Sequence, residues 1–217
     1  MNKSRIGVPI LAGVGLGAAI FAGPGGLGPP LPALGFPEPA IVSRAWQFQF
    51  SHDVPRAIAV PDQGGQNVWY WYMPYKIVNH TDTERIFIPD ITIATDRGDI
   101  IPAGRGVPSY VFAAIKTRIG NSLLERPDQM VDRVLRGEDH ARESVVVWPA
   151  SALDESTSLL SIFISGLSGE TAIAKNPVTG ESIALRRTLM LDFQMPGRPV
   201  RPQDQPVVFA GERWVMR

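Results

Sequence analysis

The sequence predicts a mainly β protein, in which a β-sandwich carries a two-helix insertion and follows an N-terminal apolar segment. Three observations predict this fold. Aromatic and β-branched residues alternate with a period of two along residues 67–78, as in a pleated strand. Further short apolar runs recur between polar turns, a spacing typical of a β-sandwich. Helical spacing is confined to residues 108–136.

The N-terminal segment, residues 1–23, carries Lys3 and Arg5 and continues as Ile6–Gly23 without a charge. A basic start before an apolar run is typical of a secretory signal peptide or a membrane anchor. Cleavage and retention are both compatible with this pattern, and so is a Gly-rich arm that packs on a partner. If the segment is retained, Ile6–Gly23 is the expected contact with a membrane.

Residues 24–39 contain six prolines and several glycines. Proline excludes both a continuous helix and a central strand, so we expect an extended linker. The β-sandwich domain is therefore expected to span residues 40–217.

The stretch Asn67–Ile101 predicts the central hairpin. Its first strand contains Pro74, which lacks a backbone donor and indicates a bulge or an edge position. The polar run 79–84 predicts a turn, 85–95 predicts the second strand, and Asp96-Arg97-Gly98-Asp99 predicts the next turn.

Two helices are expected next. Val111, Ile115 and Ile119 follow one another at four-residue intervals, and Gly120 ends this first helix. Pro127 suits the first turn of a second helix, whose apolar stripe would consist of Met130, Val131, Val134 and Leu135.

The remaining strands are short and separated by turns rich in proline, glycine and polar residues. Two precede the hairpin and the others follow the helical insertion. They are expected at residues 46–50, 56–60, 144–148, 159–164, 171–175, 182–185, 188–194, 207–209 and 213–216.

Composition excludes several classes of function. The 217 residues include 21 acidic and 21 basic side chains, a formal net charge of zero, so nothing indicates nucleic acid as a partner. The chain has no cysteine, which excludes disulfides, thiolate metal sites and cysteine nucleophiles.

No catalytic set is recognisable. His52, His80 and His140 each have an acidic neighbour, but all three fall in expected loops, where solvated turn residues are the simpler interpretation than a metal site. The run Ile164–Gly169 comes nearest to a GxSxG nucleophile elbow and lacks its glycine pattern. We therefore expect no enzyme activity, no metal and no cofactor.

Two groups of residues are candidates for binding. A loop directly before the first helix could hold an anion through backbone donors, although the same glycines could serve only to redirect the chain. It consists of Gly104, Arg105 and Gly106. Aromatics on both faces of the first hairpin strand could stack on a sugar or hold a protein partner, although burial in the core would explain at least one face. These are Trp69, Tyr70, Trp71, Tyr72 and Tyr75.

The hairpin resembles exported bacterial immunoglobulin-like domains of unassigned function. In those domains a strand ending in V-x-N precedes a short polar turn, an apolar strand and a D-x-G turn, a pattern to which Val78, Asn79, Asp96 and Gly98 correspond. The resemblance covers roughly residues 66–108. It implies an immunoglobulin-like β-sandwich in a cell-envelope setting and assigns no catalytic residue.

The expected function is therefore that of a non-catalytic interaction or structural module of the cell envelope, periplasmic or extracellular. It could be free, anchored in the inner membrane, or a subunit of a membrane complex, with an unidentified protein as partner. A carbohydrate-binding module that uses the surface aromatics, with a glycan as ligand, is one alternative, and a hydrolase of unknown substrate is another.

Overall fold

The computed structural model describes residues 37–41, 45–176, 178–197 and 202–217. They belong to a unit that spans Gly35–Arg217. The expected signal or anchor over residues 1–23, and most of the expected linker, lie outside the described residues. The prediction of a mainly β fold is confirmed by several antiparallel sheets and a single α-helix in the described chain. None of the helices in these ranges combines the length and the apolar character needed to cross a bilayer.

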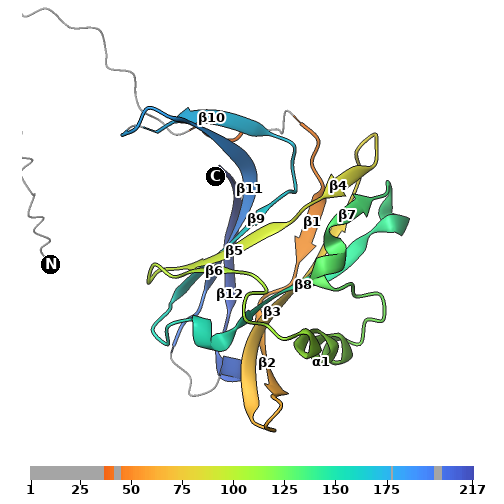
Figure 1. Cartoon of the computed structure of the whole chain (residues 1–217), viewed down its shortest axis with the longest axis vertical. Coiled ribbons are helices and arrows are strands. Elements are labelled where there is room, and N and C mark those ends of the chain that lie inside the picture. Colours follow the sequence, from red (N-terminus) through yellow and green to blue (C-terminus); the bar gives the residue numbers. More distant parts are fainter. Residues whose placement is uncertain (1–36, 42–44, 177, 198–201) are drawn as a thin grey trace, which may run out of the picture. The chain divides into compact units, whose positions relative to one another are not determined.

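The first sheet is organised around β3 (Asn67–Val78), which the sequence predicts to form a hairpin with residues 85–95. That pairing was wrong, because residues 85–87 pair with residues 132–134 and residues 90–95 belong to the second sheet. On one edge β3 pairs in succession with β1 (Gln49–His52) and β2 (Arg56–Pro61). On its other edge it pairs with β8 (Arg142–Pro149). All of these pairings are antiparallel. Because both of its edges are paired, β3 is a central strand (Figure 1).

Pro74 lies in the middle of β3, where the sequence predicts a bulge or an edge. Its carbonyl accepts a hydrogen bond of 2.9 Å from the Asp53 amide, so the backbone of Pro74 faces the break between β1 and β2. Its nitrogen faces the same break, and proline therefore removes no hydrogen bond to β8. The irregularity lies in the neighbouring edge, while β3 keeps an unbroken register with β8.

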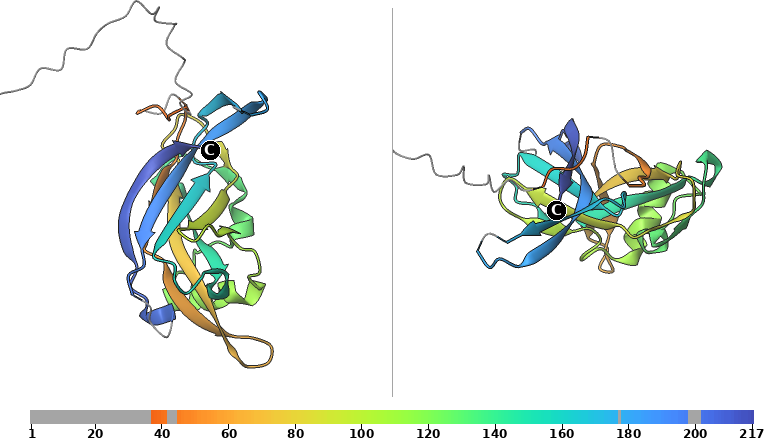
Figure 2. Two further views of the ribbon diagram at one scale, coloured as in Figure 1. Left: turned by 90° about the vertical axis from the view of Figure 1, so that its left-hand side faces the viewer. Right: turned by 90° about the horizontal axis from the view of Figure 1, so that it is seen from above.

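The second sheet begins with β6 (Ile100–Pro102), followed by β5 (Asp90–Thr95), β9 (Leu159–Ser165) and the long strand β11 (Ser182–Gln194). The first part of β11 forms a hairpin with β10 (Thr171–Lys175), which extends beyond the rest of the sheet (Figure 2). The second part of β11 lies between β9 and the last strand, β12 (Val208–Met216).

In two places, segments that the sequence predicts as separate strands form one continuous strand. Residues 182–185 and 188–194 both belong to β11, because the intervening Arg187 is buried and its guanidinium lies 2.7 Å from the Glu170 carboxylate. Residues 207–209 and 213–216 were also predicted as separate strands. They form β12, in which a bulge occurs near Gly211.

The two sheets pack face to face over a shared core. The inner face of the first sheet contributes Trp71, Met73 and Trp148, and the second sheet contributes Ile162 and Leu191, all of them buried. Period-two alternation places these side chains on one face of each strand, so a single apolar layer holds the two sheets together.

Helix α1 (Ser109–Ile119) lies where the sequence predicts the first of the two helices. It covers the outer face of the first sheet. Val111 and Ile115 of the helix are fully buried against Tyr70 and Tyr72 of β3. Strand β3 is therefore covered on both faces, by the second sheet and by α1. This arrangement explains why both of its faces are aromatic.

The prediction of a second helix was wrong. Residues 127–130 form only a short 3₁₀ turn, η1 (Pro127–Met130), and the chain continues as β7 (Asp132–Val134). Strand β7 pairs with β4 (Arg85–Phe87) as a two-stranded ribbon. Met130 and Val134 are buried, but a four-residue interval places two residues on one face of a strand as well as of a helix. The remaining 3₁₀ turns are η2 (Glu138–His140), η3 (Ala150–Ala152) and η4 (Pro202–Asp204).

The first described residues are attached to the second sheet near the base of the β10–β11 hairpin. The Ala40 amide donates to Glu170 Oε1 at 3.0 Å, and Arg187 Nη1 donates to the Ala40 carbonyl at 2.7 Å. The Arg187 guanidinium also lies 4.7 Å from the centre of the Trp214 ring. A buried ion pair thus fixes the point at which the chain joins the domain.

Candidate functional site

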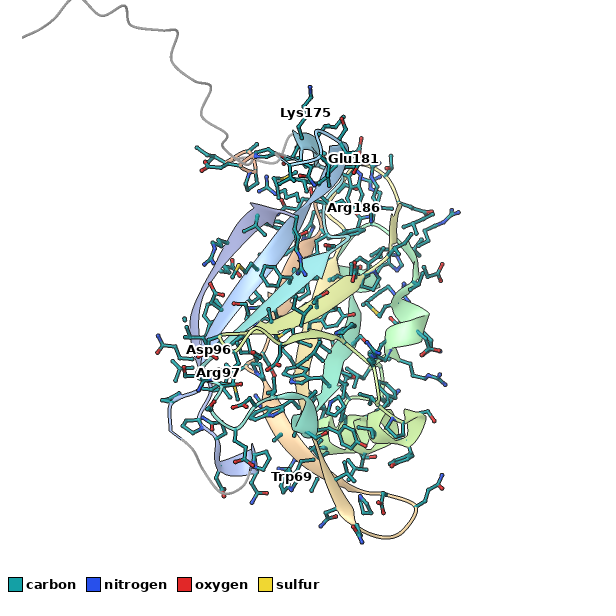
Figure 3. All side chains as sticks on the ribbon, turned by 60° about the vertical axis from the view of Figure 1, so that its left-hand side comes forward. Trp69, Asp96, Arg97, Lys175, Glu181 and Arg186 are labelled. Atoms are coloured by element: carbon teal, nitrogen blue, oxygen red, sulfur yellow. The ribbon has the colours of Figure 1, made fainter. Side chains whose placement is uncertain are left out.

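The five aromatics predicted as ligand-binding residues lie on β3, and most are buried. Four are no more than 4% exposed: Tyr70, Trp71, Tyr72 and Tyr75. Trp69 is half-buried, and Figure 3 shows it on the β2–β3 side, at the end of the domain opposite to Lys175 and Arg186. The buried rings belong to the two apolar cores, so Trp69 alone offers a partly exposed surface for stacking.

The pKa values of two buried phenols, Tyr70 and Tyr75, are raised. Burial raises the pKa of Tyr75 to about 12, although the neighbouring Ser144 and Arg142 act in the opposite direction. Burial also raises the pKa of Tyr70, with a further contribution from Tyr110. Both side chains are therefore neutral at physiological pH and serve as packing groups.

The predicted anion-binding loop lies directly before α1. Gly104 and Gly106 have φ values of 78° and 74°, which a side chain would disfavour. The Gly104 amide already donates to the Val147 carbonyl at 2.7 Å, and Arg105 is exposed. The glycines therefore redirect the chain toward α1, and anion binding by this loop stays a prediction.

The three histidines lie on different elements. His52, at the end of β1, packs against the rings of Phe193 and Phe209, with centroid distances of 5.8 and 5.2 Å. His80 Nε2 lies 2.6 Å from Gln49 Oε1, and His140 is exposed in η2. Within the described ranges, no three His, Asp or Glu side chains gather as metal ligands.

The serine-containing run at residues 164–169 has a packing role. Gly166 has a φ of 89°, and a Cβ there would lie 2.3 Å from the Ile88 carbonyl oxygen. Ser165 shares a hydrogen bond of 2.8 Å with Thr188 on the adjacent strand. This loop brings two backbone segments into close contact.

A cavity of about 910 Å³ surrounds the break between β1 and β2. Its wall carries charges of both signs, and two of them, Asp53 and Arg56, already pair at 3.4 Å. Lys76 faces Glu143 across the β3–β8 ladder. This cavity is an open polar cleft whose wall carries both cations and carboxylates.

An exposed apolar surface occurs on the β4–β7 ribbon. Ile86 pairs with Arg133 across the ladder, and alternation places Ile88, Val131 and Leu135 on the same outward side. The four aliphatic side chains are 61%, 59%, 54% and 40% exposed, respectively. We call this surface the ribbon face: Ile86, Ile88, Val131 and Leu135.

A cavity of about 550 Å³ adjoins the ribbon face. It lies against the edge of β8 that β3 does not cover, between the loop before α1 and the turn η1. Val131 of the ribbon face lines it, and so does Pro89, which follows Ile88. We call this cavity the β8 slot: its apolar walls include Ile91, Val107, Phe112, Val131, Val145 and Val147.

Sequence reasoning assigned the residues of the ribbon face to a strand and a helix without identifying a site. One signal was present, because Ile86, Phe87 and Ile88 are consecutive apolar residues in a short strand. Only one face of such a strand can pack on the core, and Phe87 occupies it with 0% exposure. The other face must then point elsewhere.

The chain matches no protein-family model, and comparisons with curated proteins and with solved structures gave no match.

Proposed function

We propose that this chain is a non-catalytic interaction module of the bacterial cell envelope. An immunoglobulin-like β-sandwich serves as its scaffold, and an unidentified protein binds the ribbon face. The proposed site is periplasmic or extracellular, and residues 1–23 direct export or hold the chain in the inner membrane.

The exposed apolar character of the ribbon face carries this proposal. Four aliphatic side chains between 40% and 61% exposed lie on one face of a small two-stranded element. Arg133, which pairs with Glu84 at 2.9 Å, lies on the same face opposite Ile86. Scattered single apolar residues are ordinary on protein surfaces, but contiguous patches rimmed by charge are typical of protein-binding sites. A protein partner would remove this surface from water.

The envelope setting is supported by the sequence. Lys3, Arg5 and the uncharged run Ile6–Gly23 form a targeting or anchoring pattern, and the proline-rich residues 24–39 separate it from the domain. Two packed antiparallel sheets support the immunoglobulin-like scaffold that the hairpin sequence resembles.

Sugar binding by the β3 aromatics is the weaker alternative, because four of the five rings belong to the cores and only Trp69 is partly exposed. A hydrolase is the other alternative. A turnover that one point substitution abolishes would overturn the non-catalytic proposal in favour of it.

Co-purification from the native host tests the proposal. The tagged full-length chain is extracted from the envelope in mild detergent as wild type, as the double variant Ile86→Asp/Ile88→Asp, and as Val178→Asp. Val178 is 91% exposed in the β10–β11 turn, so its variant introduces the same charge elsewhere. One protein is expected at fixed stoichiometry with wild type and Val178→Asp, and its loss is expected from the double variant. Equal recovery in all three samples, or no stoichiometric protein in any, would reject the ribbon face as the binding surface.

A further inference from the structure

The uncovered edge of β8 is only partly hydrogen-bonded. The Glu125 amide donates to the Glu143 carbonyl at 2.8 Å, and the Gly104 amide donates to the Val147 carbonyl at 2.7 Å. Both acceptors belong to β8 and point away from β3. Two loops therefore complete this edge at its two ends.

Val145 lies midway between these two positions. Backbone groups of alternate residues in an antiparallel strand point to the same side, so the Val145 amide and carbonyl also point away from β3. Its ladder partner is Pro74, whose backbone groups point toward the break between β1 and β2 and not toward Val145. Among the described residues, no hydrogen bond reaches either Val145 group from the uncovered side.

The unpaired amide and carbonyl of Val145 lie where a ligand could reach them. Val145 is 1% exposed and lies in the wall of the β8 slot. An unpaired buried amide or carbonyl is destabilising, so a ligand that offers both an acceptor and a donor gains by pairing there. Peptide backbone offers these two groups at the spacing of a strand, with apolar side chains on either side.

The slot is also continuous with the ribbon face. Val131 belongs to both surfaces, and Pro89 of the slot directly follows Ile88. The room along β8 is limited, because Glu143 and Val147 are already bonded to the two loops. About three residues of extended chain fit between these positions at the usual strand rise of about 3.3 Å per residue.

We propose that the β8 slot binds a short extended peptide segment of the protein partner by strand addition. The segment pairs with the Val145 amide and carbonyl and places apolar side chains against Val107, Phe112 and Val131. This inference rests on the proposed function for the identity of the ligand as a protein. It adds that the partner contributes an extended apolar segment beside the surface that covers the ribbon face.

Strand addition in the β8 slot is tested by comparing two pools of peptides that differ only in their backbone amides. The probe is a pool of capped tripeptides, acetyl-X-Thr-X-amide, in which X is Val, Ile, Leu or Phe. The matched control pool is N-methylated at every residue, which removes the amide donors and keeps the side chains. The ¹⁵N-labelled full chain is titrated in lipid nanodiscs, and the Val145 and Val147 amide resonances are followed.

We expect saturable shifts of these two amides with the first pool and at least a tenfold weaker response with the N-methylated pool. Val107→Asp, which places a charge in the slot wall, is expected to abolish the shifts. Val145→Pro removes the outward amide directly and is expected to abolish the Val147 shift as well. If Val145→Pro does not fold, Val107→Asp still decides the test.

Three results would overturn the inference. They are equal shifts with both pools, no saturable shift of either amide, or shifts with the acyl probe decanoate and none with the peptides, which would make the slot an acyl-chain site. The Ile86→Asp/Ile88→Asp variant separates the two proposals. Tripeptide binding retained in this variant, together with no stoichiometric protein in any of the three co-purification samples, would leave the slot standing and reject the ribbon face.

Discussion

Two glycines in the loop after β9, Gly166 and Gly169, lie too close to neighbouring atoms to be replaced by a larger residue. Gly166 combines a φ of 89° with a position where a Cβ would lie 2.3 Å from the Ile88 carbonyl oxygen. Gly169, in the same loop as Gly166, lies against the indole ring of Trp46. A Cβ at Gly169 would lie 2.3 Å from the ring nitrogen of Trp46. The loop after β9 therefore depends on glycine at two positions for two different reasons.

Gly166→Ala should destabilise the domain by about 3 kcal/mol, because backbone strain and steric overlap add at one position. The matched control is Gly180→Ala, which has a φ of 73° but nothing within 4 Å of its Cβ, and should cost about 1 kcal/mol. Urea unfolding followed by tryptophan fluorescence measures both. Equal costs would mean that the contact with Ile88 is unimportant.

The acidity of Tyr75 predicts a loss of stability at high pH. Its pKa is about 12 in the folded chain and 10.0 in the reference state, so the folded state holds the phenol proton more tightly. The stabilising effect is fully present below pH 10 and is lost between pH 10 and about 12, at about 1.4 kcal/mol per pH unit.

Replacing the phenol removes this dependence. Between pH 8 and pH 11, wild type should lose about 1.4 kcal/mol more unfolding free energy than Tyr75→Phe. Chemical denaturation at the two pH values gives the difference, with pH 8 as the internal reference. Parallel losses in both proteins would show that the Tyr75 hydroxyl is not buried as described.

At the scale of elements, α1 and β3 depend on each other. Tyr70 and Tyr72 point away from the second sheet and are buried only because Val111 and Ile115 cover them. The helix makes no side-chain capping bond at its N-terminus and has no acidic residue in its first turn, so packing is its main support.

Ile115→Ala should therefore cost about 3 kcal/mol, since the side chain is 0% exposed and leaves a cavity over β3. Ile173→Ala, at a position 76% exposed on β10, should change stability by no more than about 0.5 kcal/mol. Near-UV circular dichroism should change only in the first variant, because tyrosine packing lies beneath α1. A cost below about 1 kcal/mol for Ile115→Ala would show that α1 does not hold the outer face.

The elements also show how far the sequence could predict this fold. The alternation in β3 and the helical spacing of α1 are local patterns, and both are present in the structure. The pattern Met130/Val134 suits either a helix or a strand, and pairing with β4 decides between them. Arg187 looks like a strand break in sequence, but its partner Glu170 allows it to be buried.

The candidate site depends on information that a single sequence does not contain. Ile86 and Leu135 are distant in the chain and come together only when β4 pairs with β7. The open backbone pair at Val145 follows from where two loops end on β8, and no residue type signals it. The β3 aromatics gave the strongest local signal because a strand covered on both faces is apolar on both.

At the scale of the whole molecule, we propose that the domain presents the ribbon face to a protein partner in the cell envelope. The Ala40 amide and carbonyl are both hydrogen-bonded, to Glu170 and to Arg187 respectively. The proposed partner surface lies on the β4–β7 ribbon, whereas Ala40 bonds to residues of the second sheet and the loop before β10.

Site-specific photo-crosslinking in the native host tests the binding of a protein to the ribbon face most directly. A benzophenone amino acid replaces Ile86 in the full-length chain, and Gln63, exposed in the β2–β3 turn, serves as the matched control position. The account predicts that illumination links position 86 to one envelope protein and links position 63 to none. No crosslinked protein at position 86, or the same products from both positions, would contradict it.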